Sequence, residues 1–110
     1  MTASILAILL SLRLMGIPCQ IVTVSVSAYT NSGGVYPFAG LTASGVQTGP
    51  QTCACGSLYD FGTVFIVNGR VYVCQDRGGA IDDGKLDLWH ESEAEAIQFG
   101  RHTLNVVVVK

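Results

Sequence analysis

Hydrophobic and polar positions alternate in several short segments of this 110-residue chain, a pattern typical of β-strands. In residues 21–27 every even position is valine, whereas positions 23, 25 and 27 are threonine or serine. Two further apolar segments, residues 63–67 and 70–74, flank Asn68-Gly69, the dipeptide that suits a two-residue turn with positive φ. We therefore predict a half-buried strand at 21–27 and a β-hairpin that delivers Asp76 just past its second strand.

The remaining elements complete a small β-rich domain. Ser92, with Glu95 three residues later, forms a capping-box pattern, and Gly100 suits a left-handed terminator, so a short helix is predicted between them. Residues 37–50 are expected to carry a short strand and turns, residues 86–89 a short strand, and residues 103–109 a closing strand buried on both faces. Six strands at near-regular spacing favour a mainly β small barrel over a sandwich.

The first twenty residues have a different character. Residues 4–12 form an apolar run of the length found in signal peptides, too short to span a bilayer. No basic residue precedes the run, and Arg13 follows it. Three interpretations of residues 1–20 remain open: a signal peptide, an uncleaved hydrophobic anchor, or a truncated gene start. The first two predict a secreted or cell-envelope protein whose membrane contact is limited to this segment, with residues 21–110 as one domain.

Charge and cysteine content narrow the classes of partner. Charged residues make up 13% of the chain and the net charge is -2, without a basic stripe, which argues against nucleic acid as a partner. We expect a monomer.

Cys53 and Cys55 form a C-x-C pattern that does not match a zinc or redox motif, so no metal site is predicted. A disulfide from Cys74 to either of them fits an exported protein; buried apolar thiols are the alternative.

Candidate chemistry is concentrated in residues 74–89, which contain four of the eight acidic residues. Asp76 follows an apolar strand-like segment, and Asp87 stands between two leucines. A carboxylate directed toward a half-buried surface must be hydrogen-bonded, paired or used in chemistry, because its desolvation is costly. On this reasoning alone, Asp76 fits a backbone N–H acceptor in the following turn, and Asp87 a solvated strand residue. Asp82 and Asp83 fit turn positions, with calcium binding as a weaker alternative.

Five sequence blocks occur in order between residues 22 and 110: Thr42-Ala43-Ser44-Gly45, Phe61-Gly62-Thr63, Asp76-x-Gly78-Gly79-Ala80-Ile81, Leu86-Asp87-Leu88-Trp89 and Glu95-Ala96-x-x-Phe99-Gly100-Arg101. Together they resemble the 3D domain, a family named for three aspartates. The chain is similar to the catalytic domain of membrane-bound lytic transglycosylase A and to stationary-phase survival-type cell-wall lytic proteins. The resemblance implies a six-stranded double-psi β-barrel.

The resemblance also implies an activity and a partner. The partner is peptidoglycan, whose bond between N-acetylmuramic acid and N-acetylglucosamine is cleaved without water to leave a 1,6-anhydro product. No metal or organic cofactor is implied. By position, Asp87 matches the family's catalytic acid/base and Asp76 its second aspartate. Substrate contacts are expected from the loop that lines the groove and from the blocks around the aspartates: Thr42, Ala43, Gly45, Arg77, Gly78, Gly79 and Trp89. The alternative for Arg77 is a surface position, and the alternative for Trp89 is packing in the core.

One family feature is missing from the chain. The family's first aspartate usually falls a few residues before the Phe-Gly-Thr block, near Gly56 or Ser57 here, and neither position is acidic. Asp60 lies next to Phe61, too close to serve as a simple substitute. The sequence therefore predicts a lytic transglycosylase, with a non-catalytic peptidoglycan- or carbohydrate-binding module on the same barrel as the alternative.

Overall fold

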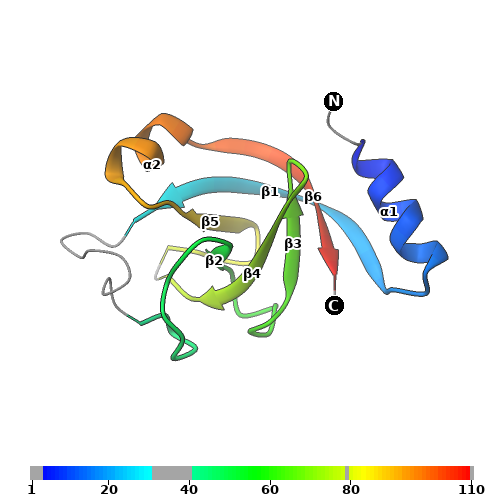
Figure 1. Ribbon diagram of the computed structural model, residues 1–110, viewed down its shortest axis with the longest axis horizontal. Helices are drawn as coiled ribbons and strands as arrows, with labels where there is room; N and C mark the ends of the chain where they lie inside the picture. Colours follow the sequence, from blue (N-terminus) through cyan, green and yellow to red (C-terminus); the bar gives the residue numbers. More distant parts are fainter. Residues whose placement is uncertain (1–3, 31–40, 79, 110) are drawn as a thin grey trace.

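Six strands close into a β-barrel in the order β1-β5-β2-β4-β3-β6. The computed structural model describes residues 4–30, 41–78 and 80–109. Its elements are α1 (Ile5–Leu14), β1 (Cys19–Tyr29), β2 (Thr52–Ala54), β3 (Val64–Val67), β4 (Arg70–Asp76), β5 (Lys85–Trp89), α2 (Glu93–Phe99) and β6 (His102–Val109), as Figure 1 shows. The mainly β class, the closed six-stranded barrel and the short helix before the last strand are confirmed. The double-psi arrangement stays a prediction.

The barrel interior is filled by the apolar positions of the alternating segments. β1 pairs antiparallel with the whole length of β6 and parallel with β5, and β2 pairs parallel with β4. Among the residues enclosed are Val24, Val26, Cys53, Cys55, Phe65, Cys74, Leu86, Leu88, Val106 and Val108. Alternation in β1 is thus confirmed, and the strand begins at Cys19 because β6 continues its pairing as far as that residue.

The hairpin between β3 and β4 has the predicted turn. Asn68 and Gly69 both adopt positive φ, 51° and 77°, as a type I′ turn requires. Asp76, predicted just past the end of β4, is instead its last residue. The strand is longer because β2 pairs with it through an irregularity in register that places Ala54 opposite Asp76.

The segment before β2 differs from the prediction. Within residues 41–50 the structure has turns and a single bridge between Leu41 and Gln47, and the strand expected in residues 37–50 forms later, at Thr52–Ala54. The other part of that prediction, residues 37–40, lies outside the described residues. At the C-terminal end, the Ser92 side chain accepts a hydrogen bond from the Glu95 N–H at 3.1 Å, as expected of the N-cap.

α1 lies against β1 and β6 on the outside of the barrel, at the end away from α2 (Figure 1). Ser4 caps its first turn by accepting a hydrogen bond from the Ala7 N–H at 3.1 Å. Among the described residues, no helix has both the length and the apolar character that crossing a membrane requires. A leader or anchor role for this segment stays a prediction.

Candidate functional site

Strand register places the two central carboxylates in one row across four neighbouring strands. Asp76 on β4 is opposite Ala54 on β2, Ala54 is opposite Asp87 on β5, and Asp87 is opposite Ser27 on β1. Paired residues share a face of the sheet, so all four side chains project from the same face. Two strand spacings separate the aspartate backbones by about 10 Å. The residue between them in this row, Ala54, is small and buried.

The carboxyl group of Asp87 is half-buried and makes few hydrogen bonds with the described residues. Its Oδ1 accepts a hydrogen bond from the Ser27 hydroxyl at 3.1 Å. Burial raises the pKa of Asp87 above its usual value and the charge of Asp76 adds to this, while the Ser27 hydrogen bond and the charges of Arg101 and His90 act in the opposite direction. The net effect favours a carboxyl group that keeps its proton to a higher pH than an ordinary aspartate.

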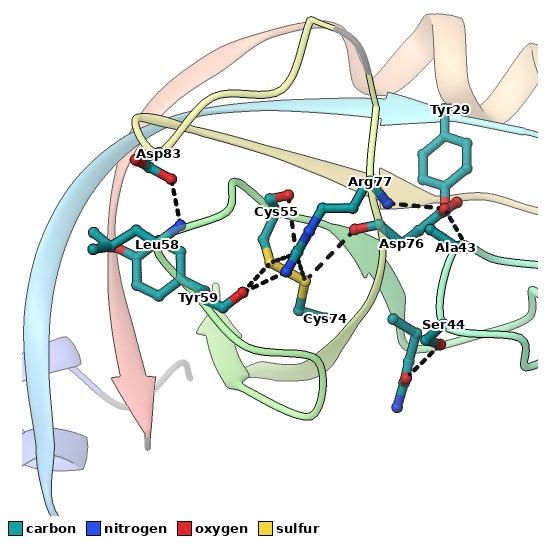
Figure 2. The surroundings of a disulfide bond; sticks show 11 residues. Tyr29, Ala43, Ser44, Cys55, Leu58, Tyr59, Cys74, Asp76, Arg77 and Asp83 are labelled. Atoms are coloured by element: carbon teal, nitrogen blue, oxygen red, sulfur yellow. Dashed lines mark hydrogen bonds between the residues drawn. A yellow bond between two sulfur atoms is a disulfide. The ribbon is translucent and has the colours of Figure 1, made fainter.

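Asp76 is held far more firmly, as Figure 2 shows. Its Oδ1 accepts hydrogen bonds from the backbone N–H groups of Ala43 and Arg77, both at 2.9 Å, and its Oδ2 accepts one from the Tyr29 hydroxyl at 3.1 Å. Burial, followed by the charges of Asp76 and Asp87, raises the pKa of Tyr29 well above its usual value. Tyr29 is therefore a stable hydrogen-bond donor, and Asp76 joins the end of β1 to the loop that carries Ala43.

That loop contains the residues predicted to line the groove. Thr42 is buried and closes the turn, since its backbone N–H donates to the Val46 carbonyl at 2.7 Å and its hydroxyl donates to the same oxygen at 2.9 Å. Gly45 adopts a φ of 90°, which favours glycine at that position. The Ser44 hydroxyl donates to Gln75 Oε1 at 2.8 Å, and the Ser44 backbone N–H donates to the Gln75 carbonyl at 3.1 Å. With the bond from Ala43 to Asp76, three hydrogen bonds hold the loop beside the end of β4. The structure thus brings Thr42, Ala43 and Gly45 close to Asp76.

The guanidinium of Arg77 is directed away from this row, toward a disulfide (Figure 2). Cys55 and Cys74 form the bond, whereas Cys53 is a buried free thiol. Arg77 donates hydrogen bonds to the carbonyl oxygens of Cys55 at 3.2 Å and Tyr59 at 2.7 Å, and it lies 4.2 Å from the centre of the Phe61 ring. These contacts use its donors within the fold, so its predicted contact with substrate lacks geometric support.

The segment where the family's first aspartate is expected is occupied by structural contacts. A side chain at Gly56 would meet the backbone nitrogen of Asp83 at 2.6 Å, so the position admits only glycine without rearrangement. The Asp83 carboxylate accepts a hydrogen bond from the Leu58 N–H at 2.8 Å, and the Asp82 carboxylate accepts one from the Gly84 N–H at 2.9 Å. Asp82 therefore serves as a turn residue, and Asp83 joins the same turn to the segment at Leu58. Residues 4–30, 41–78 and 80–109 contain no cluster of ligating side chains suited to a metal ion.

Two of the remaining predicted contacts are described by the structure. Gly78 packs closely on Ile81, whose Cγ1 would lie 2.9 Å from an added Cβ, whereas Gly79 lies outside the described residues. Trp89 is on the same face of β5 as Asp87 but only 5% exposed, which leaves little of its ring for stacking on a sugar. Its predicted contact with substrate stays a prediction.

Sequence reasoning missed several residues around Asp87. Ser27 belongs to the polar face of β1, and only the parallel register with β5 brings that face to the aspartate. Lys85 and Arg101 line a cavity of about 260 Å³ together with Asp87. The sequence signal for Lys85 was its spacing of two residues from Asp87, which puts both on one face of a strand.

Comparison with known proteins agrees with this arrangement. A family model described as the 3D domain matches residues 56–110, half of the chain, and includes both Asp76 and Asp87. No curated protein matches the sequence. The matched residues extend from the turn after β2 through the last strand, so they include the β3–β4 hairpin, the turn at Asp82 and the short helix. The chain belongs to the 3D domain family.

Proposed function

We propose that the protein is a peptidoglycan lytic transglycosylase in which Asp87 is the single acid/base. The family is linked to cell-wall lytic enzymes, and membership is consistent with a peptidoglycan-related function. The observation that carries the proposal is the setting of Asp87: half-buried, with its pKa raised by burial and only the Ser27 hydroxyl as a hydrogen-bond donor to its side chain among the described residues. A carboxyl group that keeps its proton and has a free oxygen is suited to general acid catalysis.

The reaction needs one group of this kind. Protonated Asp87 donates its proton to the glycosidic oxygen as that bond breaks and positive charge develops at the anomeric carbon of N-acetylmuramic acid. The 6-hydroxyl of the same sugar then bonds to that carbon, and its proton passes to the Asp87 carboxylate. The products are a 1,6-anhydro sugar and a free 4-hydroxyl on N-acetylglucosamine. No water is consumed, and Asp87 regains its proton.

In this proposal Asp76 is a positioning residue rather than a second acid. Both of its oxygens already accept hydrogen bonds, from Ala43, Arg77 and Tyr29. It fixes the loop beside the site, and its negative charge helps raise the pKa of Asp87. The disulfide between Cys55 and Cys74 is of the kind that persists in oxidising compartments, which supports action in the cell envelope or outside the cell.

Digestion of purified peptidoglycan tests the proposal. Wild-type protein is expected to release fragments ending in 1,6-anhydro-N-acetylmuramic acid, identified by mass spectrometry. Asp87→Asn, which keeps the shape of the side chain, should abolish these products. Asp60→Asn is the matched control, because it removes the same charge from an exposed loop residue. Full activity in Asp87→Asn, or products with ordinary reducing ends, would contradict the proposal.

One observation favours a second function, a non-catalytic peptidoglycan-binding module. The family's first aspartate is missing, and the segment from Ala54 to Tyr59 has no acidic residue and is packed against Asp83 and Arg77. Wild-type protein that binds peptidoglycan in a sedimentation assay, yet releases no anhydro product, would establish this function in place of the enzyme.

A further inference from the structure

A cavity of about 260 Å³ lies beside Asp87 on the side away from Asp76. Its lining includes Ser25, Ser27, Ile81, Lys85, Asp87 and Arg101. The volume is slightly below the range of about 300–1,000 Å³ found for ligand pockets, so the cavity accommodates one small group of a larger substrate. A glycan held with its scissile bond at Asp87 would direct a substituent into this space.

The cavity lining is determined by strand register. Ser25 is opposite Lys85 and Ser27 is opposite Asp87 in the parallel β1–β5 pair, so the four side chains form a compact patch on one face. Arg101 comes from the turn between α2 and β6, and its charge is close enough to act on the Asp87 carboxyl. Two cations from different parts of the fold therefore line the cavity that contains Asp87.

The balance of charge in the cavity is positive. Lys85 and Arg101 contribute two positive charges, against one negative charge when Asp87 is ionised and none when it is protonated for catalysis. The Lys85 ammonium donates to the Ala80 carbonyl at 3.2 Å and lies 3.7 Å from Asp82 Oδ2. The Asp82 side chain is 71% exposed, so solvent screens this pair and the ammonium keeps most of its capacity to attract an anion.

We propose that Lys85 and Arg101 form a subsite for a carboxylate carried by the sugar next to the scissile bond. This inference rests on the proposed function, and it assigns the substrate as a glycan strand whose muramic acid carries a free carboxylate, either its own or that of an attached peptide. Two sources share this chemistry: the lactyl group of a strand without stem peptides, or a carboxylate of a stem peptide. A guanidinium pairs with a carboxylate through two parallel hydrogen bonds, and an ammonium adds a point charge.

Such a subsite also links substrate binding to the protonation of Asp87. Burial and the charge of Asp76 raise the pKa of Asp87, whereas the Ser27 hydrogen bond and the charges of Arg101 and His90 lower it. Lys85 lines the same cavity. A bound carboxylate offsets the cations and adds a negative charge. Binding of the correct substrate therefore favours the protonated form of Asp87 that the reaction needs.

Kinetics on three substrates test the subsite. They are peptide-free strands with free lactyl carboxylates, the same strands with those carboxylates converted to methylamides, and intact peptide-bearing strands. Each is digested by wild-type protein, Lys85→Gln, Arg101→Gln and the double variant. Arg70→Gln is the matched control, because it removes one positive charge from the exposed first residue of β4 in the β3–β4 hairpin. Binding of each strand to wild-type protein and to the Asp87→Asn variant, which is expected to be inactive, is measured by calorimetry.

The expected pattern is specific to charge. KM for strands with free carboxylates should be about tenfold lower than for amidated strands, and each single substitution should remove most of that advantage. KM for amidated strands, and all values for Arg70→Gln, should stay within about twofold of wild type. A lower KM for peptide-free strands identifies the lactyl group as the source, and a lower KM for peptide-bearing strands identifies the stem peptide.

Two results separate this inference from the proposed function. If no strand is cleaved but wild type still binds carboxylate-bearing strands more tightly than amidated ones, the transglycosylase assignment fails and the anion subsite stands. Equal KM and equal affinity for charged and amidated strands in wild type would overturn the subsite. An equal rise in KM for charged and amidated strands in the double variant would also overturn it.

Discussion

Reduction of the Cys55–Cys74 disulfide is expected to lower the stability of the barrel by a predictable amount. The bond joins the segment after β2 to the last part of β4 across a sequence separation of 19 residues. Closing a loop of this size removes chain entropy from the unfolded state worth about 3 kcal/mol. For a domain of this size, a loss of about 3 kcal/mol lowers the Tm by roughly 12–24 °C.

The reduced protein keeps both sulfur atoms, so the comparison isolates the covalent link from the packing of the side chains. Cys55 and Cys74 are completely buried, and the carbonyl oxygens that accept hydrogen bonds from Arg77 are backbone groups that reduction does not alter chemically. Because Cys55 is next to Ala54 and Cys74 is two residues from Asp76, we also expect the row of side chains at the site to loosen and activity to fall.

Urea unfolding followed by the fluorescence of Trp89, the single tryptophan, measures the effect with and without reductant. The oxidised, denatured protein should contain two titratable thiols and the reduced protein four. A Cys55→Ala/Cys74→Ala variant provides the control, since its stability should not respond to reductant. A change of less than about 1 kcal/mol on reduction, or four thiols without reductant, would refute the reasoning.

Three further predictions follow from the same geometry. Tyr29→Phe removes one of three hydrogen bonds to the Asp76 carboxylate, so the free energy of unfolding should fall by about 1–3 kcal/mol in urea, and an unchanged value would contradict the bond. The pKa of Asp87 is raised above 3.8, so just above that pH the folded protein binds more protons than the unfolded chain. The free energy of unfolding therefore declines as the pH rises through that range. Asp87→Asn should accordingly raise the Tm at pH 7 but not at pH 3. Gly69→Ala forces alanine into a φ of 77° and should cost about 1 kcal/mol, whereas Asn68→Gly should be nearly neutral in the same thermal melt.

The sequence by itself determined the elements whose signals are local. Alternation gave the first strand, Asn68-Gly69 gave the hairpin turn, and Ser92 gave the start of the second helix, because each depends on residues within a few positions of one another. The order of short motifs also pointed to the family, which the match over residues 56–110 shows. The strand β2 was misplaced because its residues pair with distant partners and carry no alternation of their own.

Tertiary structure alone decided how the chemistry is arranged. Asp76 and Asp87 are related by their common neighbour Ala54, and no local pattern reveals that register. The same is true of the cations. The family resemblance made Arg77 a candidate substrate contact, with a surface position as the alternative, but its guanidinium binds the loop at Tyr59. Lys85 and Arg101 line the cavity at Asp87 instead. Local sequence sets strands, turns and caps through short-range sterics and hydrogen bonds. Which side chains meet across the barrel depends on long-range strand pairing, which is fixed only when the whole core packs.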